Sequence, residues 1–128
     1  MSIQTDAVRF TEDHEWLRPD ADGGVVVGIT DHAQSALGDL VFVQLPAVGS
    51  HYDAGDELAV IESVKAAGDI KAPLSGTVVA VNEAIVQDPG KVNSDPLGSG
   101  WFVKLAPDEA PRLDGLLTAQ AYARLIEG

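Results

Sequence analysis

The 128-residue chain contains no cysteine. This absence excludes disulfides, thiolate metal sites and cysteine nucleophiles, and it leaves the redox state of the compartment undetermined. Aromatic residues make up only 5% of the chain, although 45% of it is hydrophobic. A chain of this length is expected to form one domain, and its core has to consist mainly of Val, Leu, Ile and Ala.

Basic residues are scarce. The chain has 8 Lys and Arg against 20 Asp and Glu, which gives a formal net charge of -12. A phosphate backbone is repelled by such a field, so we expect no nucleic-acid partner. The acidity is interpreted equally well as a solvated surface or as a docking surface for basic partners.

Signals for targeting and membrane insertion are missing. The first ten residues, MSIQTDAVRF, have no basic start followed by an apolar run, and a single Arg is too little for an organelle transit peptide. No apolar stretch approaches the length needed to span a bilayer. We therefore expect a cytoplasmic protein that does not contact membranes.

The motifs of self-sufficient catalysis are missing as well. No G-x-S-x-G, P-loop or G-x-G-x-x-G occurs. His14, His32 and His51 are widely spaced, with no short-range pair suited to a metal. Carboxylate pairs arise by chance in so acidic a chain. We therefore expect neither a catalytic centre nor a metal site.

Short β-branched runs between turn residues dominate the pattern, which predicts a mainly β domain built as a small sandwich or barrel. A turn is expected at residues 22–24, just before the first of these runs. Strands are expected at residues 25–29, 40–45, 57–62, 70–72, 77–82 and 101–105. The run at 40–45 is apolar at nearly every position, which predicts a strand covered on most sides.

Two helices complete the prediction. A short one is expected between an N-cap at Thr30 and a stop at Gly38. A second one is expected over residues 119–127 after a cap at Thr118, packed on the β domain. Its apolar face holds Tyr122, Leu125 and Ile126, and the preceding Leu113, Leu116 and Leu117 also lie at helical spacing.

Lys65 is one of only four lysines, and it lies in the segment ESVKAAGD between two expected strands. The small residues around it, Ser63, Ala66, Ala67 and Gly68, suit a tight turn, so we expect a hairpin tip at residues 63–68. A lysine at such a tip extends a long flexible stem into solvent.

This segment resembles the lipoyl-attachment segment of the glycine cleavage system H protein family. Two departures are Gly68, where the family usually has Ser, and Lys91, where Leu is common. Other short segments match the family in the same order, over about residues 9–127. They are Phe10-Thr11, His14-Glu15-Trp16, Val27-Gly28-Ile29-Thr30-Asp31, Ala33-Gln34, Leu37-Gly38-Asp39, Leu45-Pro46, Ser75-Gly76, Val81-Asn82-Glu83-Ala84, Val92-Asn93-Ser94-Asp95-Pro96 and Gly100-Trp101.

The resemblance implies a lipoyl-domain-like flattened β-barrel or barrel-sandwich hybrid. It implies a single domain (1–128) with a lipoyl-binding β core at 24–106 and a C-terminal helical segment at 109–128. It also implies a monomeric, non-catalytic carrier with lipoate attached as an amide to Lys65. The dithiolane of lipoate would supply the reactive sulfurs that this Cys-free chain lacks.

The implied partners are the enzymes that act on the lipoyl arm. The arm takes the aminomethyl group of glycine at the pyridoxal-phosphate glycine decarboxylase and delivers it to the aminomethyltransferase. Dihydrolipoamide dehydrogenase then reoxidises the dithiol, and a lipoylating enzyme attaches the cofactor at the outset. Tethering raises the effective concentration of the cargo at each docked partner.

The resemblance also implies a surface cleft that holds the loaded arm, with Glu15, His32 and Asp69 at the matching positions. A carboxylate there would bind the charged amine, although Glu15 and Asp69 are interpreted equally well as ordinary surface acids. Glu62 and Asp69 flank Lys65 and are expected to orient the hairpin for the lipoylating enzyme. Two glycines, Gly49 and Gly76, are expected in turns.

Other carriers use the same hairpin. Biotin acceptors resemble Met-Lys-Met, whereas Val64 and Ala66 flank Lys65 here. Lipoyl domains of 2-oxo acid dehydrogenases typically show Asp-Lys-Ala and lack the C-terminal helix. A lipoate-relay protein, or an interaction module that does not serve glycine cleavage, would present the same lysine, so the sequence leaves this alternative open.

Overall fold

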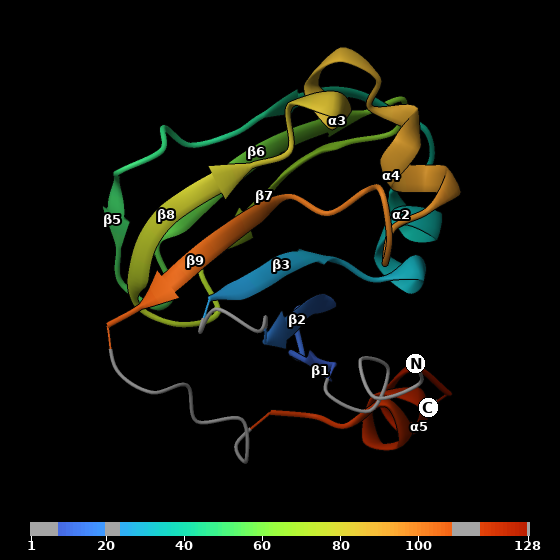
Figure 1. The fold of residues 1–128 in the computed structure, drawn as a ribbon. Coiled ribbons are helices and arrows are strands. Elements are labelled where there is room, and N and C mark those ends of the chain that lie inside the picture. The colour runs from blue at the N-terminus through green and yellow to red at the C-terminus, as the bar shows by residue number, and fades with distance from the viewer. Residues whose placement is uncertain (1–7, 20–23, 109–115, 128) are drawn as a thin grey trace.

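Two antiparallel β-sheets face each other in the computed structural model, which describes residues 8–19, 24–108 and 116–127 (Figure 1). One sheet has the order β1-β2-β3-β9-β8-β5, and the other has the order β4-β6-β7. The mainly β, sandwich-like fold expected from the sequence is confirmed. The strands are β1 (Arg9–Phe10), β2 (Glu15–Pro19), β3 (Val25–Ile29), β4 (Leu40–Gln44), β5 (His51–Tyr52), β6 (Glu57–Ser63), β7 (Ala67–Lys71), β8 (Gly76–Val81) and β9 (Val103–Pro107).

Three short helices gather at one end of the sheets, and a fourth helix lies apart from them (Figure 1). The Oγ1 of Thr30 accepts a hydrogen bond from the Ala33 N–H (3.1 Å), and Gly38 ends the helix at φ +81°, so the predicted short helix is confirmed. Two helices between β8 and β9 were not predicted. The helices are α2 (Asp31–Leu37), α3 (Glu83–Gln87), α4 (Gly90–Ser94) and α5 (Ala119–Glu127). Within the described residues, none of them is long and apolar enough to cross a bilayer.

The main core lies between the two sheets and consists chiefly of Val, Leu and Ile, as the composition predicts. A second, smaller cluster lies on the outer face of the larger sheet and contains Phe10, Trp16, Val26 and Tyr122. Every residue of β3 is buried because successive side chains point to opposite faces of the sheet and pack into one cluster or the other. Helix α5 therefore covers the side of β1 and β2 that faces away from the main core.

The prediction that residues 40–45 form a strand covered on most sides is wrong. Strand β4 does form, but Val41 is 57% exposed and Phe42 is 43% exposed. The strand lies at the edge of the three-stranded sheet and has an irregular register between Leu40 and Phe42. Its position in the strand order, which the local pattern does not contain, leaves these side chains in solvent.

The C-terminal prediction is only partly correct. Leu117 is not helical, because its backbone pairs with Phe10 through hydrogen bonds of 2.8 and 2.9 Å. On α5, Tyr122 is buried, whereas Leu125 and Ile126 are exposed. Leu113, the rest of the segment at 109–115 and most of the turn expected at 22–24 lie outside the described residues.

Candidate functional site

Lys65 lies at the tip of the β6–β7 hairpin, where the expected turn is found. Strand β6 ends at Ser63 and β7 begins at Ala67, which leaves residues 64–66 as the turn. The hydroxyl of Ser63 shapes this turn by accepting hydrogen bonds from the N–H groups of Lys65 (3.2 Å) and Ala66 (3.0 Å). Gly68 was expected in the turn, but it lies in β7 opposite Ile61, so that detail of the prediction is wrong.

The tip is tied to the end of α2. The Val64 N–H donates to the Asp39 carbonyl at 3.0 Å. The stem of Lys65 lies across Gly38, because a Cβ added at Gly38 would be 3.2 Å from Lys65 Cε. Lys65 itself is exposed. The amine is therefore accessible while the base of its side chain is supported.

Asn93 on α4 fixes the support under the lysine. Its Nδ2 donates to the Gly38 carbonyl and to Gln34 Oε1, each at 2.9 Å. Its Oδ1 accepts from the Leu40 N–H, also at 2.9 Å. One amide side chain thus joins the end of α2 to the start of β4. Asn93 lies in one of the segments that match the family, but the sequence gave no indication of this role.

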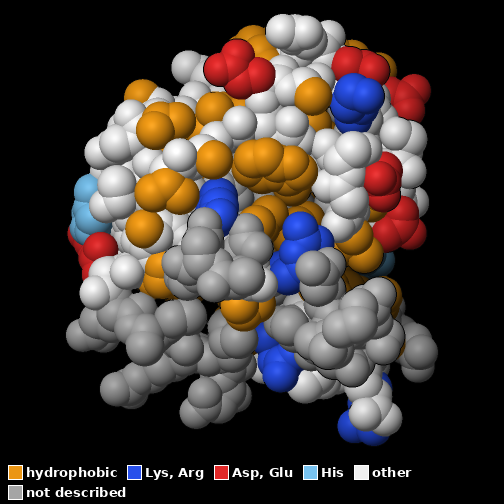
Figure 2. Space-filling model, viewed as in Figure 1, with side chains coloured by type: hydrophobic (Ala, Val, Ile, Leu, Met, Phe, Trp, Pro, Cys, Tyr) orange, Lys and Arg blue, Asp and Glu red, His pale blue; other side chains and the backbone are white. Residues whose placement is uncertain are grey.

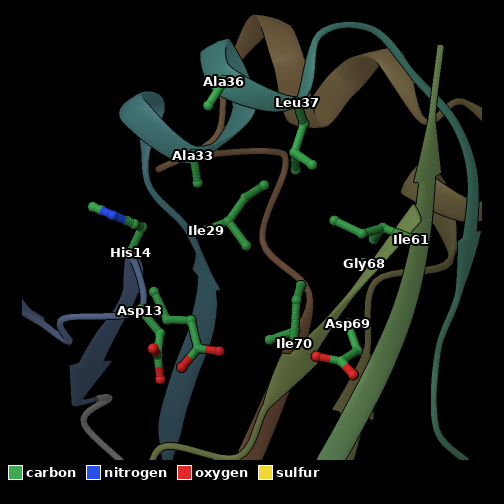
Figure 3. A pocket seen from close by; sticks show the side chains of 11 residues that line it. Asp13, His14, Ile29, Ala33, Ala36, Leu37, Ile61, Gly68, Asp69 and Ile70 are labelled. Carbon is green, nitrogen blue, oxygen red and sulfur yellow. The ribbon is translucent and has the colours of Figure 1, made fainter. Parts of the chain in front are cut away.

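A cleft of about 240 Å³ opens between α2 and the strands β3, β6 and β7 (Figure 3). Figure 3 shows the side chains of α2 on one side of this space and those of Ile29 and Ile70 projecting into it. The polar residues at the cleft are Asp13, His14, Glu15 and Asp69. The apolar lining is formed by Ile29, Ala33, Ala36, Leu37, Ile61 and Ile70. An apolar chain ending in a charged group matches this distribution.

Glu15 is the buried acid of the cleft, with only 5% of its surface exposed. Its Oε2 accepts a hydrogen bond from the Lys71 N–H at 2.9 Å. Burial raises the pKa of Glu15 to about 7, although the hydrogen bond from Lys71 opposes that change. The carboxyl group therefore gains or loses its charge near neutral pH.

The other expected site residues are distributed differently. Asp69 borders the cleft, where its Oδ1 lies 3.2 Å from Lys71 Nζ. Glu62 is exposed on β6, outside the cleft lining. His32 is also outside the lining, but its ring packs on that of His14 with centroids 4.7 Å apart. The cleft therefore brings Glu15 and Asp69 together with His14 rather than with His32.

Folding brings other ionisable groups together. His51 Nε2 lies 2.7 Å from Asp108 Oδ2, and this ion pair raises the pKa of His51. With Asp53 they form a group whose potential ligand atoms lie within 4.8 Å of one another, all on exposed residues. Sequence spacing missed this proximity because the two strand ends that carry it are distant in the chain.

Residues 8–128 match the family model described as glycine cleavage H-protein. A glycine cleavage system H protein of Psychrobacter sp. (strain PRwf-1) is 52% identical over 122 residues, which cover 95% of this chain and 97% of the relative. One of Halorhodospira halophila is 49% identical over 126 residues, covering 98% and 97%. The crystal structure of a glycine cleavage system H protein from Mycobacterium marinum superposes with a TM-score of 0.86 at 44% identity, covering 96% of this chain and 98% of that one.

Proposed function

The chain belongs to the glycine cleavage H-protein family, and from this premise we propose that it is the lipoyl carrier of glycine cleavage, with lipoate attached to Lys65. The observation that carries the assignment to Lys65 is its exposed position at the hairpin tip. The names of the relatives favour this role over a biotin carrier or a lipoate relay. The protein works as a carrier and not as an enzyme.

The surroundings of Lys65 fit a lipoyl amide. Ala66 and Ala67 are small, and Gly38 leaves space under the lysine stem that a Cβ would fill. Acylation removes the charge of the amine and lengthens the arm. Lipoate, once attached, supplies the sulfur chemistry, and this chain supplies presentation and protection.

The cleft is the proposed resting place of the loaded arm. Its apolar walls suit a hydrocarbon chain, and Glu15 and Asp69 are the acids proposed to hold the cationic amine. A cation beside Glu15 favours the charged carboxylate and so counteracts the effect of burial on its pKa. His32 is proposed to support the cleft indirectly, because its ring packs on that of His14.

The proposed partners are the pyridoxal-phosphate glycine decarboxylase, the aminomethyltransferase, dihydrolipoamide dehydrogenase and the lipoylating enzyme. Asp and Glu side chains on the face seen in Figure 2 gather at the end that holds α2, α3 and α4. This distribution favours partners with basic docking surfaces. Exposed Glu62 and Asp69 are the residues proposed to orient the hairpin for lipoylation. The chain is proposed to act as a monomeric single domain, with its β core at 24–106.

Intact-mass measurement after production with lipoate tests the attachment site. The wild type and the control Lys91→Arg should gain one lipoyl-sized increment, located at Lys65 by peptide mapping. The Lys65→Arg variant should gain none, because a guanidinium is not acylated in its place. An increment that survives Lys65→Arg would defeat the assignment.

Glycine–CO₂ exchange with the decarboxylase tests the role. The exchange should require the lipoylated protein and should not proceed with the Lys65→Arg variant. Equal exchange with protein produced without lipoate would contradict a carrier function in glycine cleavage.

A further inference from the structure

Three side chains from distant parts of the sequence meet beside the cleft. The hydroxyl of Tyr122 on α5 lies 2.7 Å from His14 Nδ1 and 2.7 Å from Thr30 Oγ1. The Tyr122 ring is stacked on Phe10, with centroids 4.7 Å apart and an interplanar angle of 12°. Tyr122 and Thr30 are both buried. The C-terminal helix therefore contributes a fixed hydroxyl group to a cluster whose other members, Phe10, His14 and Thr30, come from the first third of the chain.

The hydrogen bonds form a continuous chain. The Ala33 N–H donates to Thr30 Oγ1, so that oxygen already acts as an acceptor. One ordering uses both hydroxyl hydrogens: Thr30 donates to Tyr122, and Tyr122 donates to His14 Nδ1. This ordering requires a neutral imidazole. Burial, followed by the neighbouring His32, holds the pKa of His14 below its usual value, whereas Asp13 acts in the opposite direction.

The two residues joined by Tyr122 are neighbours at one edge of the cleft, where the Thr30 N–H donates to the His14 carbonyl at 3.0 Å. Thr30 begins α2, whose Ala33, Ala36 and Leu37 line one side. His14 also lines the cleft and directly precedes Glu15. His14 also has φ +67°, a conformation that is uncommon for residues other than glycine and that persists when its surroundings hold it.

We propose that Tyr122 is a positioning residue for cargo protection, since its hydroxyl fixes the His14 ring beside the N-cap of α2, at the edge of the cleft that shields the loaded arm. This inference rests on the proposed function and assigns the C-terminal helix a part in it. Loss of the cargo consumes one water molecule, breaks the carbon–sulfur bond, and releases formaldehyde and ammonia while the thiol is regenerated. A misaligned cleft mouth admits that water.

The Tyr122→Phe variant tests the proposal because it removes one oxygen and keeps the ring stacked on Phe10. The isolated, aminomethyl-loaded variant should release formaldehyde about fivefold faster than the wild type, the factor that about 1 kcal/mol represents. Thr30→Val should have a similar effect, whereas Thr30→Ser, which keeps the hydroxyl, should release at the wild-type rate. Two-dimensional NMR spectra establish that each variant is folded.

A second measurement uses the protein without lipoate. An NMR titration of His14 in the Tyr122→Phe variant should show a pKa displaced from that of the wild type, because the ring loses its hydroxyl partner. The charged and titratable groups around His14, which are Asp13, Glu15 and His32, stay unchanged between the two proteins.

Equal rates of formaldehyde release from Tyr122→Phe and the wild type would overturn the proposal. A Thr30→Ser variant that releases formaldehyde as fast as Thr30→Val would overturn it as well, because the hydroxyl would then have no effect. These outcomes are distinct from a failure of the proposed function. That failure would appear in the wild type itself, as absence of lipoate from Lys65 or as exchange that does not require it.

Discussion

The stem of Lys65 lies directly across Gly38, so the proposed acceptor lysine and the end of α2 form one structural unit. A Cβ at Gly38 would approach Lys65 Cε to 3.2 Å and Val64 Cγ2 to 3.4 Å. The unit is completed by the hydrogen bond from the Val64 N–H to the Asp39 carbonyl. Changes at the end of the helix should therefore alter the reaction at the hairpin.

Gly38→Ala should slow lipoylation of Lys65 as well as destabilise the protein. Gly38 has φ +81°, so an alanine there costs about 1–3 kcal/mol of unfolding free energy. Gly55→Ala is the matched control, because Gly55 also has a positive φ (92°) but has nothing within 4 Å of an added Cβ. Chemical denaturation should show a loss in both variants, and timed mass spectra should show slower lipoylation in Gly38→Ala alone. Equal slowing in both would mean that the contact with Lys65 has no effect.

Asn93→Ala should lower the unfolding free energy by about 2 kcal/mol, because it leaves the Leu40 N–H and the Gly38 carbonyl without their side-chain partner. Ser94→Ala on the same helix is the control, since the Ser94 hydroxyl is exposed and makes only a long 3.4 Å hydrogen bond. Urea denaturation measures both. A loss in Asn93→Ala no larger than that in the control would show that water replaces the amide adequately.

Glu15→Gln should stabilise the empty protein at pH 8 more than at pH 5. The folded protein binds the Glu15 proton more tightly than the unfolded chain does, so the stability due to this carboxyl is complete below about pH 4.5 and is lost as the pH rises through about 7. Glutamine does not ionise and avoids that loss, which amounts to about 3 kcal/mol. Thermal unfolding across this pH range, with exposed Glu12→Gln as the control, measures the difference. A gain independent of pH would contradict ionisation of Glu15 as its cause.

Gly76→Ala should destabilise the protein by about 1–3 kcal/mol. Gly76 was expected in a turn, but it begins β8 and lies against β9, where an added Cβ would come within 2.6 Å of the Ala106 carbonyl oxygen. The obstructing atom belongs to the backbone, so it cannot move aside by a change of side-chain rotamer. Gly90→Ala on α4 is the control and should be neutral or stabilising, because the nearest atom is 3.4 Å away. Calorimetry that showed no loss for Gly76→Ala would mean that the two strands separate at little cost.

Local signals in the sequence predicted the elements that depend on neighbouring residues. The cap at Thr30, the stop at Gly38 and the tip around Lys65 are each determined within a few positions, and each was found where expected. The exposure of Phe42 depends instead on which strand ends the smaller sheet. Periodicity along one strand carries no information on that order.

The polar part of the cleft shows the same limit. Glu15 and Asp69 were named from matching family positions, and the structure brings both to one cleft. His14 lies in a segment that matches the family, yet its contact with Tyr122 joins residues 108 positions apart. No local pattern predicts such a contact, which arises only when α5 packs on the outer face of the larger sheet.

The hydrogen bond between Glu15 and Lys71 has a consequence for how the empty and loaded states are distinguished. Glu15 belongs to the larger sheet and Lys71 to the smaller one, so this bond joins the two at the cleft. A charged carboxylate is a stronger acceptor than a neutral one. The cation that Glu15 is proposed to hold would therefore strengthen the bond, and the Lys71 amide hydrogen should exchange with solvent deuterium more slowly when cargo is present. Hydrogen exchange at this one backbone amide should therefore report whether the carrier holds its cargo.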